Sequence, residues 1–107
     1  MIEFNKIFKR QDIIESIYNA INFSENSYSI EGIFLNHETI DIKDYAFEIL
    51  IISIQKEKFE ISKYIIDTIG SVNNIGVNKN NYKTLVNNPK GLEFLKIELF
   101  KDSVSNF

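Results

Sequence analysis

Three patterns in this 107-residue chain predict a mainly α fold, an irregular stack of about five to seven short helices forming one domain, 1–107. Apolar residues recur at helical spacing in several segments. The isoleucine-rich stretch 45–54 is followed by a charged elbow and by a second periodic run. Gly70 and Pro89 stand where a helix is expected to end and to begin.

The first clear periodicity follows Asp12. Apolar residues recur at i, i+1, i+4, i+5 and i+8, which predicts an amphipathic helix with one buried stripe: Ile13, Ile14, Ile17, Tyr18 and Ile21. Asp12 is expected to cap this helix, and Glu15 stands where a capping box places a carboxylate. The apolar residues of 2–8 predict a further helical turn or two before it.

Residues 22–29 are rich in turn formers and predict a loop. The next segment, 30–40, is open between helix, strand and loop. Gly32 disfavours a helix, whereas Ser29 is a good cap for one. A short helix over 30–35 is therefore the prediction.

The stretch 41–54 has two interpretations, because the β-branched residues of 49–54 also suit a buried strand. Two features favour a helix. Asp41 and Asp44 offer N-terminal caps, and the apolar region extends for about ten residues, longer than a typical strand. A helix that is apolar nearly all round must be buried between neighbours, as the middle helix of a stack is.

The second half of the chain predicts two helices separated by a loop. Positions 61, 65 and 69 fall on one line of a helix over 59–69, which Gly70 ends. The asparagine-rich segment 71–81 predicts a loop with a tight turn at 80–81. Pro89 opens the last helix, one face of which carries Leu92, Leu95 and Leu99.

The run Glu-Ile-Ser-Lys-Tyr-Ile-Ile at 60–66 resembles the Glu-Ile-Val-Lys-Tyr-Leu-Leu core of the second helix of an ankyrin repeat. Val72-Asn73 follows at the spacing where ankyrin repeats carry Val-Asn, and segment 8–18 is similar to 54–64. The Thr-Pro-Leu-His turn of the family is absent, and its loop glycine is displaced to Gly70. The resemblance implies an ankyrin-like, irregular stack of helix pairs that binds a protein.

Charge is distributed unevenly along the chain, whose formal net charge is −3. Residues 1–10 carry +2, residues 11–55 carry eight acids against one lysine, and residues 56–107 carry +2. The acidic segment is suited to attract a basic partner, and the alternative is a set of charges scattered over the surface. It argues against nucleic acid as a ligand there, because phosphates would be repelled.

No cysteine is present, which excludes disulfides and thiolate metal sites. The N-terminus lacks the pattern of a secretory signal. The longest apolar run is far shorter than the ~20 residues that span a bilayer. The sequence therefore predicts a cytoplasmic protein that does not enter a membrane.

Residues suited to catalysis are sparse. The single histidine, His37, stands beside Glu38 as a candidate catalytic or metal pair, but an exposed loop histidine is the simpler interpretation. Asp41, Asp44 and Glu48 lie at helical spacing and suit a hard cation, although caps and surface solubility explain them more economically. No glycine-rich phosphate loop occurs. The sequence therefore predicts neither an enzyme nor a cofactor or metal site.

In size and composition the chain resembles small immunity proteins, which neutralise a cognate bacterial toxin in contact-dependent inhibition and related systems. It is therefore expected to be an inhibitor, monomeric outside its complex, that blocks the active site of a basic nuclease through fast, salt-sensitive association. The candidate contacts are five acids and three aromatic anchors: Glu31, Glu38, Asp41, Asp44, Glu48, Tyr28, Phe34 and Tyr45.

Two alternatives stay open. An ankyrin-like adaptor, phage-encoded or directed at a host, would recognise a protein through an exposed apolar or aromatic groove instead of an acidic patch. A metal-dependent or hydrolytic enzyme would depend on His37 and the nearby acids, so that replacing His37 by alanine would abolish its activity.

Overall fold

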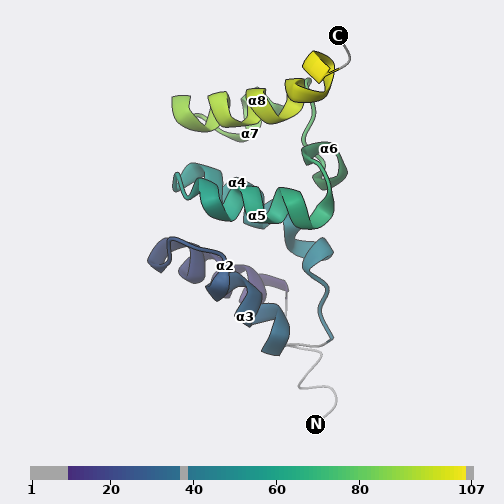
Figure 1. The fold of residues 1–107 in the computed structure, drawn as a ribbon. Coiled ribbons are helices and arrows are strands. Elements are labelled where there is room, and N and C mark those ends of the chain that lie inside the picture. The colour runs from purple at the N-terminus through teal and green to yellow at the C-terminus, as the bar shows by residue number, and fades with distance from the viewer. Residues whose placement is uncertain (1–9, 37–38, 106–107) are drawn as a thin grey trace.

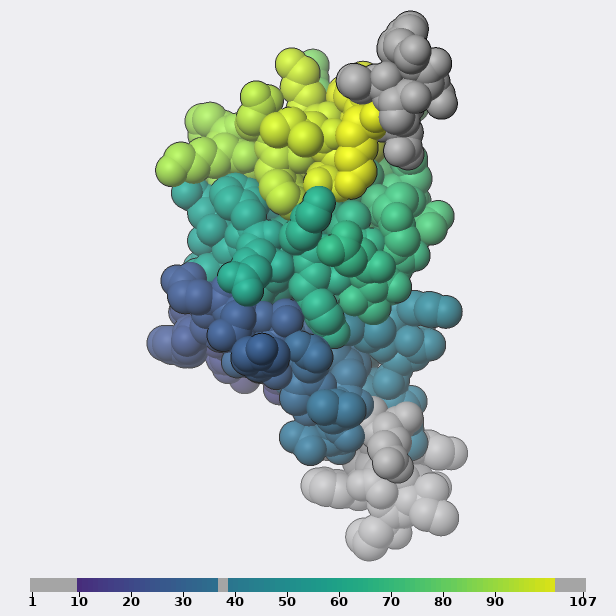
Figure 2. Space-filling view, in the orientation of Figure 1, coloured from purple at the N-terminus to yellow at the C-terminus, as the bar shows by residue number. Residues whose placement is uncertain are grey.

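The computed structural model describes residues 10–36 and 39–105, and these two segments contain helices and no strand. Seven α-helices and one 3-10 helix in these segments form three stacked layers (Figure 1). Figure 2 shows the layers as successive bands in direct contact along the molecule. The prediction of a mainly α fold is confirmed, and the number of helices agrees with it.

The first layer pairs α2 (Arg10–Phe23) with α3 (Tyr28–Asn36). The isoleucines of the predicted stripe turn inward, whereas Tyr18 stays 42% exposed. Asp12 lies in the first turn of α2, so its predicted role as the cap is wrong: the helix already begins two residues earlier.

The helix predicted over 30–35 is confirmed by α3, but Ser29 lies inside it and does not cap it. The side chain of Asn26 instead accepts a hydrogen bond from the N–H of Tyr28 at 3.0 Å. Because α2 runs on to Phe23, the loop predicted over 22–29 contracts to the few residues between the two helices.

The central layer is a hairpin of α4 (Ala46–Gln55) and α5 (Phe59–Ile69), entered through the 3-10 helix η1 (Ile42–Tyr45). The isoleucine-rich stretch is thus helical. Asp41 caps η1 as predicted, since its carboxylate accepts a hydrogen bond from the N–H of Lys43 at 3.0 Å. Asp44 lies inside η1 and caps no helix, because Tyr45 occupies the cap position of α4.

Two serines meet inside the α4–α5 hairpin. Ser53 Oγ and Ser62 Oγ lie 2.6 Å apart, and both side chains are fully buried. Ser53 Oγ also lies 2.9 Å from the carbonyl of Leu50, and Ser62 Oγ lies 3.4 Å from the carbonyl of Lys58, so each hydroxyl has a carbonyl acceptor as well as its partner. Burial of these polar groups is therefore compensated by hydrogen bonds.

The helix α5 ends as predicted. Gly70 adopts a φ of 116°, which suits glycine and strains other residues, and its N–H donates to the carbonyl of Ile66 at 2.7 Å. The chain then enters α6 (Val72–Ile75). The prediction of a plain loop over 71–81 is wrong here, because Ser71 caps this short helix and accepts from the N–H of Asn74.

The last layer pairs α7 (Tyr82–Leu85) with α8 (Pro89–Ser105). Pro89 opens α8 as predicted, and Leu95 and Leu99 face inward. The backbone of α8 comes very close to α4 at Gly91, where an added Cβ would lie 2.5 Å from Ile54 Cγ2. Only glycine permits this approach.

Ion pairs join neighbouring layers at their edges. Arg10–Glu48 (2.6 Å) and Glu25–Lys58 (3.0 Å) join the first layer to the central layer. Lys63–Glu98 (3.3 Å) and Lys90–Glu57 (3.7 Å) join the last layer to the central layer. The rings of Phe59 and Phe94 also stack across the junction of α5 and α8, with centroids 5.0 Å apart. Each layer therefore contacts its neighbour through polar as well as apolar groups.

Candidate partner-binding site

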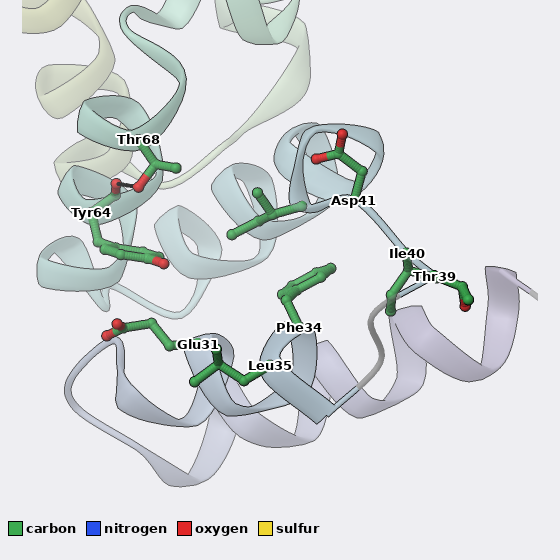
Figure 3. Close-up of a pocket in the computed structure, with 9 residues that line it drawn as sticks. Glu31, Phe34, Leu35, Thr39, Ile40, Asp41, Tyr64 and Thr68 are labelled. Carbon is green, nitrogen blue, oxygen red and sulfur yellow. Dashed lines mark hydrogen bonds between the residues drawn. The ribbon is translucent and has the colours of Figure 1, made fainter.

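A hollow of about 480 Å³ opens between α3, the segment 39–42 and α5. Figure 3 shows Phe34 pointing into it, with Glu31 to one side and Asp41 to the other. The remaining lining residues come from the same three elements: Leu35, Thr39, Ile40, Ile42, Tyr64 and Thr68. The volume falls within the ~300–1,000 Å³ typical of ligand pockets.

The hollow combines a fixed carboxylate with a neutral phenol. Glu31 accepts a hydrogen bond from Ser27 Oγ at 2.9 Å, which holds its side chain. Burial raises the pKa of Tyr64, and the charge of Glu31 raises it further. Tyr64 thus keeps its proton at neutral pH and offers a hydrogen-bond donor, while Glu31 and the exposed Asp41 offer acceptors.

An aromatic pair supports the hollow from within. The ring centroids of Phe34 and Tyr45 lie 6.0 Å apart at an interplanar angle of 47°. Tyr45 is only 7% exposed, and the guanidinium of Arg10 lies 4.7 Å from its ring centroid. Tyr45 is therefore placed to support Phe34, while Phe34 has the access to solvent that an anchor needs.

Arg10 organises the acids next to the hollow. Its guanidinium pairs with Glu48 at 2.6 Å and donates to the carbonyl of Asp44 at 3.0 Å. The hydrogen bond to Glu48 raises the pKa of Arg10 above its ordinary value, against the opposing effect of burial. The charge of Glu48 is therefore neutralised within the fold. Its second oxygen, Oε1, is buried without a hydrogen-bond partner among the described residues.

The predicted contacts fall into three groups. Glu31, Phe34 and Asp41 meet at the hollow. Asp44, Tyr45 and Glu48 gather around Arg10 beside it, and Tyr28 is 76% exposed on α3 and does not line the hollow. Glu38 and His37 lie outside the described residues.

Two residues of α5 were missed from the sequence. Tyr64 and Thr68 line the hollow from the central layer, and Thr68 Oγ1 donates to the carbonyl of Tyr64 at 2.8 Å. Their spacing of four residues, beside the buried Ile61 and Ile65 on the same stripe of α5, was a signal for a shared face. It does not say which other helix that face meets.

Among the residues that the structure describes, no group of three or more histidine, cysteine or acidic side chains is arranged to hold a metal ion. None of the described helices has the length and apolar character needed to cross a membrane. The chain matches no protein-family model, no curated protein and no solved structure.

Proposed function

We propose that the chain is an immunity protein that acts in the cytoplasm, binding a cognate bacterial toxin, a basic nuclease, and covering its active site. The observation that carries this proposal is the hollow, where Glu31 and Asp41 flank the ring of Phe34. An aromatic floor between two carboxylates suits the long side chain of a lysine or arginine.

Such a side chain would lie with its aliphatic part against Phe34 and its cation near Glu31. The phenol of Tyr64, which keeps its proton, is a donor for a backbone carbonyl of the partner. Asp44 is exposed next to the hollow and adds to the negative field. Glu48 acts on the partner only indirectly, through its pair with Arg10.

The charge of the first layer supports the same proposal. Residues 10–36 carry four acids, Asp12, Glu15, Glu25 and Glu31, against Arg10 alone, a net charge of −3. A field of this sign speeds the approach of a basic protein and repels nucleic acid. The inhibitor would then compete with the substrate of the nuclease for its phosphate-binding cleft.

The test uses the protein encoded by the gene next to that of this chain. Calorimetry measures binding at about 50 mM and about 300 mM salt, since exposed charges are screened over this range. The Kd is expected to rise at least about tenfold with salt, and again in Glu31→Lys and Asp41→Lys. Inhibition of nuclease activity should weaken in parallel.

Glu60→Lys is the matched control, because Glu60 is an exposed acid of α5 that does not line the hollow. It should leave the Kd within about twofold of the unmodified chain. An affinity indifferent both to salt and to the two charge reversals would contradict the proposal.

An adaptor that binds its partner through apolar contacts is the second candidate function. The observation that favours it is the exposure of Leu35 (77%) and Tyr28 (76%) on α3. Its binding would survive high salt and would be lost in Tyr28→Gln, at a residue that does not line the hollow, whereas the inhibitor would show the opposite sensitivity.

A further inference from the structure

The two ends of the stack carry opposite charge. The first layer, residues 10–36, has the net charge of −3 derived above. In the last layer, residues 82–105 carry four lysines against Glu93, Glu98 and Asp102, a net charge of +1. The molecule is therefore an electric dipole whose poles are its two terminal layers (Figure 1).

The outer side of α8 carries a groove with a basic rim. Two hollows of about 420 and about 480 Å³ share Glu93 and Lys96 in their linings and therefore adjoin along the helix. Apolar residues of the groove include Leu92, Ile97 and Phe100, and Ile97 is 59% exposed. Its lysines are Lys83, Lys96 and Lys101.

The outer side of α3 is apolar as well. At 100° per residue, Tyr28, Gly32 and Leu35 fall on the face opposite the fully buried Ile30. Tyr28 and Leu35 are among the most exposed apolar side chains, and a Cβ added at Gly32 would meet no atom within 4 Å. A second helix can approach closely there, and Glu31 lies next to this face.

We propose that the occupant of the α8 groove is the α3 face of a second copy of this chain. Leu35 and Tyr28 of one copy would cover Ile97 and Phe100 of the next, and Glu31 would meet the lysine rim. Apolar surface matches apolar surface, and the negative pole meets the positive one. The terminal layers of stacked-helix proteins need a polar outer face to stay soluble, and both ends here are partly apolar.

A symmetric pair is disfavoured by the same charges. Two α8 grooves facing each other would bring three lysines and one glutamate against the same set, a net charge of +2 against +2, and two α3 faces would bring acid against acid. The head-to-tail contact leaves one free end on every copy, so the assembly grows with concentration instead of stopping at a dimer. This inference does not depend on a toxin partner, and it replaces the expectation from the sequence that the chain is monomeric outside its complex.

Sedimentation velocity on the full chain tests it over a range of concentrations. At about 50 mM salt the average mass should rise steadily beyond that of a dimer, and about 500 mM salt should reduce the growth strongly. Leu35→Gln and Ile97→Gln should each raise the Kd of association about tenfold or more, because each removes one buried apolar contact.

Mixing the two variants gives the sharpest result. Leu35→Gln keeps an intact α8 groove and Ile97→Gln keeps an intact α3 face, so the mixture should form a dimer of one copy of each and grow no further. Tyr18→Gln is the control, because Tyr18 is an exposed aromatic residue outside both proposed faces. Its ring centroid lies 4.8 Å from Lys56 Nζ, beside the central layer. Circular dichroism checks that every variant keeps its helices.

Two outcomes would overturn the inference. A chain that stays monomeric at all concentrations would show that neither face binds a second copy and would leave the groove to a different protein. A dimer that survives Leu35→Gln would instead show a symmetric contact. Neither result would bear on toxin binding, which the calorimetry above measures separately.

Discussion

The first and the last layer pack against the same central hairpin in different ways. The α2–α3 layer uses a stripe of isoleucines and an exposed arginine that reaches Glu48. The α7–α8 layer comes closer, with backbone contact at Gly91 and a carboxylate, Glu98, that two lysines pair. The central layer thus supports two ends of different chemistry.

The two ends are also connected through what they bind. Leu35 lines the hollow and lies on the apolar face of α3. A basic partner in the hollow and a second copy on that face would therefore exclude each other. Under the two proposals above, binding of a basic partner would release the chain from its own assemblies, one copy at a time.

The largest effect is expected from core truncation in either end layer. Leu95→Ala and Ile17→Ala each remove a fully buried side chain and should each lower the free energy of unfolding by about 3 kcal/mol. Amide hydrogen exchange should then separate the two ends: Leu95→Ala opens α7–α8 first, and Ile17→Ala opens α2–α3 first. Equal loss of protection in all three layers would contradict this picture.

Substitutions at two helical glycines should change the free energy of unfolding in opposite directions. Gly91→Leu should lower the free energy of unfolding by about 2 kcal/mol, because the new side chain would collide with Ile54. Gly32→Ala should raise it by about 0.8 kcal/mol, since the site is open and alanine favours the helix. Urea denaturation of the two variants at low concentration measures both. The comparison fails if the two changes have the same sign.

Glu98 makes the last layer sensitive to acid. Its side chain is only 6% exposed, and burial alone would raise its pKa, but hydrogen bonds from Lys101 and Lys63 lower it below the ordinary value. The carboxylate is thus more acidic in the folded chain than in the unfolded one, whose pKa is about 4.3. Its stabilisation is present above that pH and is lost as the pH falls through the lower folded pKa.

Glu98→Gln should therefore cost about 1.5 kcal/mol at pH 7 and progressively less as the pH falls below about 4. Unfolding in urea at several pH values measures the difference from the unmodified chain. A cost that stays constant down to the lowest pH would mean that the charge of Glu98 contributes nothing.

A smaller effect than at Glu98 is expected at Arg10, which makes the corresponding ion pair between the first layer and the central one. Its side chain is 51% exposed, so Arg10→Gln should cost at most about 1 kcal/mol. A double-mutant cycle with Glu48→Gln isolates the coupling between the two side chains. A coupling larger than that of Glu98 with Lys63 would reverse the ranking of the two layers.

Local patterns in the sequence predicted most of the fold. The period of the apolar residues gave the inward stripe of α2, and Gly70 and Pro89 marked the helix ends that the structure contains. Short elements were harder to predict. In 71–81, the many asparagines favoured the prediction of a loop over the short helix α6. Ser71 as a cap and the apolar pair Val72 and Ile75 did indicate that helix.

The candidate site was predicted less completely, because it depends on contacts between distant segments. The acids of 11–55 were recognised as a group, and Glu31, Phe34 and Asp41 do meet. That Arg10 reaches Glu48, 38 positions along the chain, is decided by how α2 packs on α4. No local pattern carries this information, and the same holds for the position of Tyr64 across from α3.

The paired hydroxyls of Ser53 and Ser62 have a consequence for the uniqueness of the fold. Isoleucine faces attract one another without direction, so α4 and α5 could slide or rotate by a turn and still hide their apolar surface. Only one alignment brings the two oxygens to 2.6 Å, whereas in any other alignment each hydroxyl keeps only the carbonyl near it in sequence, that of Leu50 or that of Lys58. The two hydroxyls thus favour one register of the α4–α5 hairpin. Replacing both serines by alanine would test whether the hairpin keeps that single register.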